Sequence, residues 1–205
     1  MQITIDKKTG ILSAIIAVLM GVILLMAGSH NGKSNFLGMN HSGTQYQTTV
    51  TSTSLIGSDT MFFQMMIPHH QQAVDISALA IVTSKDSELI ALAKEIRDGQ
   101  SSEIVQMKAW LSGDGQGGSA GHPMGDGVGG MLTSSEVATL KSLKGSAFDV
   151  YWLKKMIVHH QGAIHMVTMI QDSPRSDILA FGQNIDKVQS AQINQMNQML
   201  KRLGA

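Results

Sequence analysis

The fold of this chain is decided by the sequence MFFQMMIPHHQQAVDISALA at residues 61–80, because a related sequence follows 90 residues later. The second copy is YWLKKMIVHHQGAIHMVTMI, at residues 151–170. Both copies carry two adjacent histidines and place apolar residues three and four positions apart, as a helix with one buried face does. Two related helices at this separation indicate an internal duplication.

A second pair of related segments follows the first. DSELIALAKEIRDGQSSEIVQMKAWL begins at Asp86, and RSDILAFGQNIDKVQSAQINQMNQML begins at Arg175. Each copy is therefore predicted to be one antiparallel helical hairpin, over residues 58–112 and 146–204. Two hairpins make a four-helix bundle over residues 58–205, and the predicted fold class is all-α.

Several residues predict where helices begin. Ser84 or Asp86 can cap the second helix, and Ser173 followed by Pro174 can cap the fourth. The sequence TSSE at 133–136 is a capping box, which predicts a short extra helix over 133–144.

Two segments read as connections rather than as elements. Residues 113–130 contain nine glycines and are predicted to link the two hairpins. Residues 29–57 are rich in small polar side chains and are predicted to be a flexible tether.

The N-terminal residues 1–28 predict a membrane anchor or a signal segment. Lys7 and Lys8 precede an uncharged run at 11–27, whose length lies between that of a signal-peptide core and that of a membrane span. In both interpretations the lysines stay inside and the rest of the chain is exported. We therefore expect an extracytoplasmic protein, periplasmic or at the cell surface, that residues 11–27 anchor to the cytoplasmic membrane.

The composition excludes several classes of function. The 15 basic and 15 acidic side chains balance, so long-range attraction toward nucleic acid is not expected. The chain has no cysteine, which excludes disulfides, thiolate metal sites and thiol catalysis. It has 15 methionines, so the thioether is the sulfur ligand that it offers.

Methionine and histidine recur at spacings that place their side chains side by side on a helix. Met66 precedes the first histidine pair by three and four residues, and Met156 precedes the second pair in the same way. The candidate metal ligands on these two helices are Met65, Met66, His69, His70, Met156, His159, His160, His165 and Met169. A thioether and an imidazole at these spacings can bind one ion.

The other two helices supply a second set of candidates. Met107 and Met196 could complete the coordination from the facing helices. Four polar residues interrupt the apolar stripes of these helices: Gln100, Glu103, Gln189 and Gln192. Because buried polar groups are costly without partners, we expect these four to hydrogen-bond the histidines from behind.

Thioether and imidazole together select soft ions, Cu(I) first and Ag(I) by similarity. Hard cations need clustered carboxylates, which the helices lack. Imidazole must be neutral to bind a metal, and its ordinary pKa is about 6.5. From the sequence we therefore expect Cu(I) affinity to fall between about pH 7 and pH 5.

Three functions compete. The leading one is a non-catalytic protein that buffers Cu(I) or hands it to a copper-transfer protein. A di-iron or di-manganese oxidoreductase would need Glu-x-x-His motifs, and no acidic residue here is followed by histidine three positions later. The third is a structural or signalling ectodomain without metal, since methionine on an apolar helix face is usually core filler.

The repeated motifs resemble a known family, the one called domain of unknown function 305. The sequences MIPHHQ at 66–71 and QSSEIVQM at 100–107 match its hallmark, and MIVHHQGA at 156–163 and QSAQINQM at 189–196 match it less fully. The resemblance implies a ferritin-like four-helix bundle, often exported, and a copper-binding role in some members. The second copy departs at Val158 and Gln192, which replace a proline and a glutamate of the motif.

Overall fold

The computed structural model describes residues 54–115 and 127–205, which form five α-helices and two short 3-10 turns. The helices are α2 (Gly57–Thr83), α3 (Ser87–Gly113), α4 (Ser134–Ser142), α5 (Gly145–Val167) and α6 (Ser176–Leu203), and the turns are η1 (Val128–Gly130) and η2 (Thr168–Ile170). The described residues contain no strand, as the sequence predicted.

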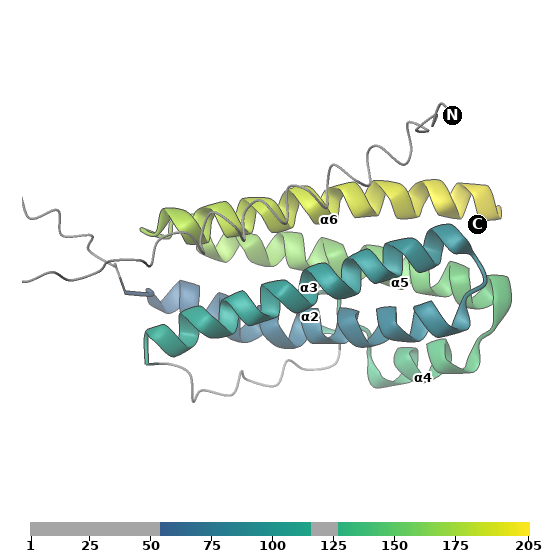
Figure 1. Ribbon diagram of the computed structural model, residues 1–205, viewed down its shortest axis with the longest axis horizontal. Helices are drawn as coiled ribbons and strands as arrows, with labels where there is room; N and C mark the ends of the chain where they lie inside the picture. Colours follow the sequence, from purple (N-terminus) through teal and green to yellow (C-terminus); the bar gives the residue numbers. More distant parts are fainter. Residues whose placement is uncertain (1–53, 116–126) are drawn as a thin grey trace, which may run out of the picture. The chain divides into compact units, whose positions relative to one another are not determined.

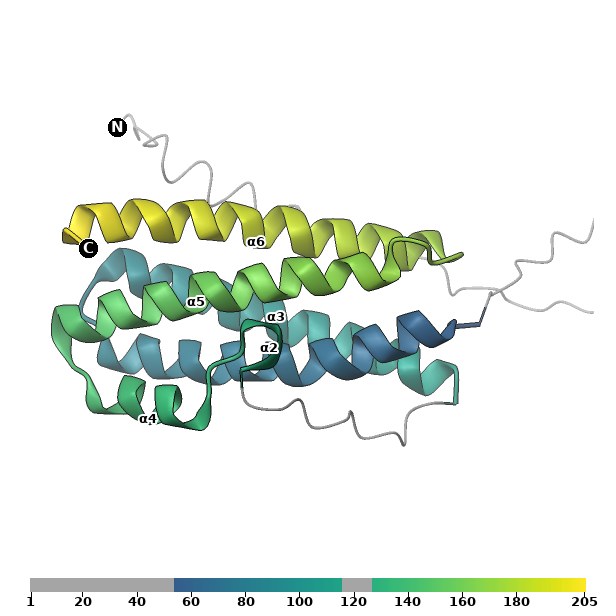
Figure 2. The same ribbon diagram turned by 180° about the vertical axis from the view of Figure 1, so that it is seen from behind.

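The four long helices form two hairpins that lie alongside each other (Figure 1). α2 pairs with α3, α5 pairs with α6, and the hairpins meet where α2 packs against α5. Seen from behind, α3 and α5 run in the same direction, so the chain must travel back along the bundle between them (Figure 2). The turn η1 and the short helix α4 belong to this connection.

The helix starts confirm two of the predicted caps and correct a third. The side chain of Asp86 accepts hydrogen bonds from the amides of Glu88 and Leu89, and Thr133 closes the predicted capping box with Glu136. The Ser173–Pro174 prediction is wrong, because α6 begins only at Ser176. The Ser173 hydroxyl instead donates a hydrogen bond to Asp59 on α2, at 3.1 Å.

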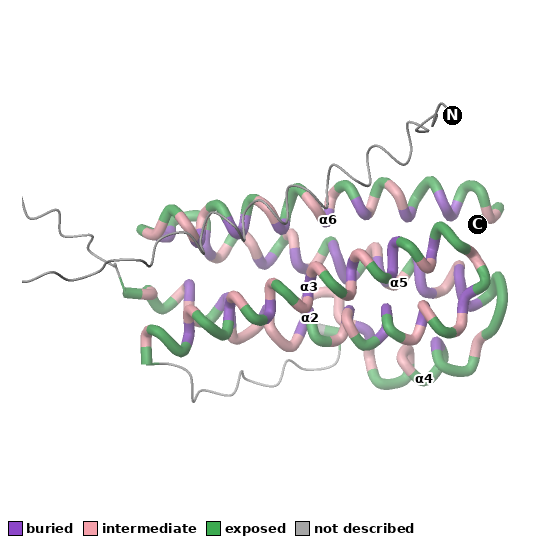
Figure 3. The backbone as a smooth tube through the Cα atoms, in the orientation of Figure 1, coloured by how far each residue is buried: buried purple, intermediate pink, exposed green. Residues whose placement is uncertain are grey.

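Buried positions recur along each of the four long helices (Figure 3). The apolar residues among them form two clusters. The first cluster includes Ile76, Leu92 and Trp152, and the second includes Phe62 and Phe181. Each long helix crosses from one cluster to the other through buried polar residues. These residues are His69 and His70 on α2, Gln100 on α3, His159 and His160 on α5, and Gln189 and Gln192 on α6. A polar layer therefore divides the core.

One large side chain joins the hairpins inside the first cluster. Trp152 is fully buried, and its indole Nε1 donates a hydrogen bond to the carbonyl of Ile76 across the α2–α5 contact, at 3.1 Å. Truncating a buried aromatic side chain of this size typically costs about 3–5 kcal/mol, so Trp152 contributes strongly to hairpin docking.

The predicted anchor at 1–28, nearly all of the tether at 29–57 and part of the linker at 113–130 lie outside the described residues. In the described ranges, 54–115 and 127–205, no helix is both long enough and apolar enough to cross a membrane.

Candidate metal centre

Four histidines meet at the contact between the two hairpins. His69 and His70 come from α2, His159 and His160 come from α5, and all four side chains are fully buried. The imidazole rings of His69 and His159 lie against each other across the contact, with centroids 3.7 Å apart and ring planes tilted by 35°. The duplicated histidine pairs therefore form one buried group, which we call the histidine layer.

Each imidazole of the histidine layer points its Nε2 atom at an oxygen. Nε2 of His70 lies 2.7 Å from the Glu103 carboxylate, and Nε2 of His160 lies 2.8 Å from the side-chain oxygen of Gln192. Nε2 of His69 lies 2.8 Å from the Gly129 carbonyl, and Nε2 of His159 lies 3.1 Å from the His69 carbonyl.

These contacts decide where the imidazole protons are. A carbonyl oxygen only accepts hydrogen bonds, so Nε2 of His69 and His159 must carry the proton. The Gln192 amide is oriented by its NH₂ group, which donates to Glu95 at 3.1 Å and leaves its oxygen to accept from His160. With the protons on Nε2, each neutral ring holds its lone pair on Nδ1.

The Nδ1 atoms of all four histidines are buried and have no hydrogen-bond partner. Buried polar atoms without partners are rare in folded proteins and cost about 1–3 kcal/mol each. The amide groups of Gln100 and Gln189 are also buried and without partners. The histidine layer therefore offers lone pairs that the protein itself does not use, which fits a site for a metal ion.

Burial favours the neutral form of three of these imidazoles, those of His69, His159 and His160. Desolvation, reinforced by the neighbouring His70, lowers the pKa of His69 to about 3. Desolvation also lowers the pKa of His160 to about 4, and it lowers the pKa of His159 well below the usual value. For these three imidazoles, competition between protons and a metal ion therefore moves to more acidic pH than the window between pH 7 and pH 5 that the sequence led us to expect.

The polar residues on α3 and α6 behave in two ways. Glu103 and Gln192 accept hydrogen bonds from the histidines, as the sequence predicted. The expectation for Gln100 and Gln189 is wrong, because neither amide bonds a histidine. Gln100 lies one helical turn before Glu103, and Gln189 lies one turn before Gln192. Both amides are buried in the layer and have no hydrogen-bond partner.

Sequence reasoning missed two members of the layer. Glu95 orients the Gln192 amide from the other hairpin, and Gly129 supplies the acceptor for His69. Neither position carries a periodic signal: Glu95 lies beside the apolar stripe of α3, and Gly129 belongs to the glycine-rich connection. Both contacts depend on how separate parts of the chain dock.

The predicted methionine ligands divide between the two apolar clusters. Met66 and Met107 of the first hairpin are fully buried in the second cluster, and Met156 and Met196 of the second hairpin are fully buried in the first cluster. The two methionine pairs therefore lie in different apolar clusters, on opposite sides of the histidine layer.

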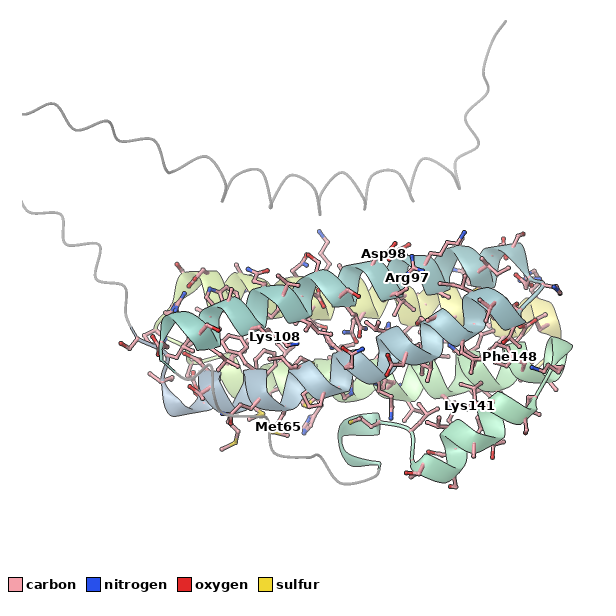
Figure 4. The ribbon with its side chains drawn as sticks, turned by 60° about the horizontal axis from the view of Figure 1, so that its bottom comes forward. Met65, Arg97, Asp98, Lys108, Lys141 and Phe148 are labelled. Carbon is pink, nitrogen blue, oxygen red and sulfur yellow. The ribbon has the colours of Figure 1, made fainter. Side chains whose placement is uncertain are left out.

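The remaining predicted ligands lie farther out. Met65 and Met169 are half-buried and His165 is exposed, and Figure 4 shows Met65 at the outer edge of the bundle. The structure does not bring these three into the histidine layer. Within the described residues, His, Asp and Glu do not gather in groups of three or more that could hold a metal ion.

Two helical hairpins of related sequence, each carrying a buried histidine pair, define the class of this protein. The chain belongs to the family described as domain of unknown function (DUF305), whose model matches residues 59–200. The resemblance in the repeated motifs is thereby confirmed. No curated protein sequence matches the chain significantly.

Several solved structures resemble this one, and two of them are DUF305 proteins. A DUF305 fragment from Deinococcus radiodurans is 30% identical and has a TM-score of 0.68, with 73% of this chain and 99% of that chain covered. A Streptomyces coelicolor DUF305 protein, named as a candidate secreted protein, is 30% identical with a TM-score of 0.67, over 72% and 94% of the chains. CopM in its Cu(I)-bound form is 28% identical with a TM-score of 0.60, over 70% and 96%.

Proposed function

We propose that this protein binds Cu(I), and also Ag(I), through methionine and histidine side chains, and that it buffers copper or hands it to a transfer protein. The observation that carries the proposal is the set of four buried imidazoles whose Nδ1 atoms have no hydrogen-bond partner. The related CopM has been solved with Cu(I), with Cu(II) and with Ag, which supports the choice of metals.

The ligand chemistry supports a soft ion. Buried methionines lie in the apolar cluster on each side of the histidine layer, and thioether together with imidazole favours Cu(I) and Ag(I). Met66 and Met107 would serve one ion with a histidine of the first hairpin, and Met156 and Met196 would serve another with a histidine of the second. Glu103 and Gln192 would hold the imidazoles in orientation.

The fold supports a metal-binding role, and separate observations support export. Two hairpins joined by a long return connection follow the course of ferritin-like bundles, which build metal sites from side chains on facing helices. The uncharged run at 11–27 and the secreted character suggested for the Streptomyces coelicolor relative support export and anchoring.

A titration of the full-length protein with Cu(I) against a competing chelator tests this function. The protein is purified without a metal-affinity tag. Replacing His69 and His70 by alanine should remove binding in one hairpin, and replacing His159 and His160 should remove it in the other. His165→Ala is the matched control, because this imidazole is exposed. Wild-type protein that takes up no Cu(I) would refute the proposal.

The two competing functions predict other outcomes. Among the described residues Glu103 is the only carboxylate that hydrogen-bonds a histidine of the layer, whereas a di-iron oxidoreductase needs several inward carboxylates. We therefore propose no catalytic activity, and oxygen consumption with added Fe(II) should stay at the background rate. A metal-free signalling ectodomain would contain no copper after expression in copper-supplemented medium.

A further inference from the structure

The described part of the connection that precedes α4 touches the histidine layer through the carbonyl of Gly129. We call residues 127–132, which include the turn η1, the strap. The side chain of Gln72 on α2 holds one end of the strap by two hydrogen bonds: its NH₂ group donates to the Leu132 carbonyl at 2.9 Å, and its oxygen accepts from the Leu132 amide at 2.7 Å. This paired contact fixes the strap against α2.

The other end of the strap touches the backbone of α5. A Cβ atom added at Gly162 would lie 1.5 Å from the Gly129 carbonyl oxygen, so only glycine permits this approach. Gly130 has a φ of +79°, and a Cβ atom there would lie 2.3 Å from the Val158 carbonyl. The strap therefore rests on α5 through contacts between backbones.

These two anchors occupy equivalent positions in the duplicated sequence. Gln72 and Gly162 each lie two residues after the second histidine of their pair, and they differ where the neighbouring residues agree. Gln72 hydrogen-bonds the backbone of Leu132, and Gly162 lacks the Cβ atom that would collide with Gly129. Both residues contact the strap. The strap in turn places the Gly129 carbonyl 2.8 Å from Nε2 of His69.

We propose that the strap fixes the tautomer and orientation of His69, and that Gln72 and Gly162 are the positioning residues that hold it there. The Gly129 carbonyl keeps the proton on Nε2 and so leaves the Nδ1 lone pair for a ligand. The opposite tautomer would set the lone pair of Nε2 against the carbonyl oxygen and leave both without a hydrogen bond.

The consequence for metal binding rests on the function proposed above. A metal-ligating histidine usually donates its second ring N–H to a carboxylate or carbonyl, and loss of that partner costs about 10–100-fold in metal affinity. The tautomer itself does not depend on metal, so the two parts are tested separately.

The first experiment is NMR of the full-length, metal-free protein with ¹⁵N-labelled histidine, which reports the protonated nitrogen of each ring. The variants are Gly162→Ala, whose methyl group must displace the strap, and Gln72→Leu, which removes both bonds to Leu132. The matched controls are Gly99→Ala, a helical glycine with nothing within 4 Å of its added methyl group, and Gln71→Ala, an exposed neighbour whose side chain bonds only Asp75 in this structure. Circular dichroism checks that each variant folds.

The wild type and both controls should show His69 protonated on Nε2. In Gly162→Ala and Gln72→Leu the His69 signals should change to a mixture of tautomers, while His70 and His160 keep theirs. The proposal is overturned if wild-type His69 carries its proton on Nδ1, or if the tautomer survives displacement of the strap in the folded variants. Should Gly162→Ala fail to fold, Gln72→Leu alone decides.

The second experiment measures Cu(I) affinity for the same proteins. We expect Gly162→Ala and Gln72→Leu to bind at least about tenfold more weakly than their controls. Equal affinity in a variant whose tautomer has changed would overturn the positioning role. Absence of Cu(I) binding in the wild type would instead refute the proposed function, and the tautomer result would still stand.

Discussion

The two hairpins carry the same histidine pair but hold it differently. In the first hairpin, His70 donates to the carboxylate of Glu103 and His69 donates to the strap. In the second hairpin, His160 donates to the neutral amide of Gln192 and His159 donates to the backbone carbonyl of His69. Both hairpins have the two imidazoles in the same tautomer, but the groups that accept hydrogen bonds from these imidazoles differ between the hairpins.

This difference teaches that equal motifs need not make equal sites. A carboxylate behind an imidazole raises its basicity as a ligand more than an amide does. Glu103 is also partly accessible, with 13% of its side chain exposed, whereas Gln192 is buried and tied to Glu95. We therefore expect the first hairpin to bind Cu(I) more tightly than the second.

Acid should produce the largest effect on the fold, and mainly through the second hairpin. The pKa of His159 and His160 is lowered by burial, as is that of His69 in the first hairpin. Below the ordinary pKa of about 6.5 the unfolded chain takes up protons that the folded chain refuses, so stability falls as pH falls toward 4. Each of the three can contribute about 1.4 kcal/mol per pH unit to the free energy of unfolding.

Urea unfolding of the metal-free protein between pH 7 and pH 5 measures this slope. Replacing His159 and His160 by alanine should remove more of it than replacing His69 alone. A free energy of unfolding that does not depend on pH in this window would mean that the imidazoles are accessible to protons.

Gln192→Glu should have the next largest effect, because it gives the second hairpin the carboxylate of the first. The new carboxylate would face Glu95, which now accepts from the Gln192 amide at 3.1 Å. Two carboxylates at this distance repel, and the loss of a partly buried hydrogen bond adds to the cost, so we expect about 1–3 kcal/mol of destabilisation.

Adding Glu95→Gln to this variant should recover most of the loss, and urea midpoints at pH 7 measure both steps. Gln192→Glu protein as stable as the wild type would show that Glu95 does not face position 192 in solution.

Glu103→Gln makes the opposite exchange and should have a smaller effect. It replaces the carboxylate behind His70 by an amide that can still accept the hydrogen bond. Cu(I) affinity in the first hairpin should fall by about tenfold, to the level of the second. Chelator competition measures this change, and an unaltered affinity would show that the charge of Glu103 is not used.

Methionine replacements should have the smallest effect on the fold. Met66→Leu and Met156→Leu nearly conserve volume, so each should change the free energy of unfolding by less than about 1.5 kcal/mol. Each should nevertheless weaken Cu(I) binding in its own hairpin. Loss of binding in both hairpins from one replacement would contradict the separation of the methionine pairs into two clusters.

The sequence predicted the fold well because duplication and helical periodicity are local signals. The spacing of His69 and His159 located the two equivalent helices, and the capping box at Thr133 located α4. The start of α6 was missed by two residues: the Ser173 oxygen accepts a hydrogen bond from the Arg175 amide, and the helix begins only at Ser176. The same hydroxyl also donates to Asp59, which lies 114 residues earlier in the chain and could not be paired with Ser173 from local sequence.

The candidate site was predictable in its residues more than in its geometry. The burial of all four imidazoles agrees with the helical stripes read from the sequence. The lack of partners for Gln100 and Gln189, and the roles of Glu95 and Gly129, depend on the register between hairpins and on the path of the connection. Neither is encoded in the period of a single helix.

Because Trp152 hydrogen-bonds the Ile76 carbonyl of the other hairpin, its fluorescence can report whether the two hairpins are docked. This indole lies in a dry interior and belongs to one hairpin while its acceptor belongs to the other. The second tryptophan, Trp110, stacks on Phe63 near the other end of the bundle. Separation of the hairpins should therefore shift the Trp152 emission to longer wavelength, and Trp110→Phe would isolate that signal as an intrinsic fluorescent gauge of docking.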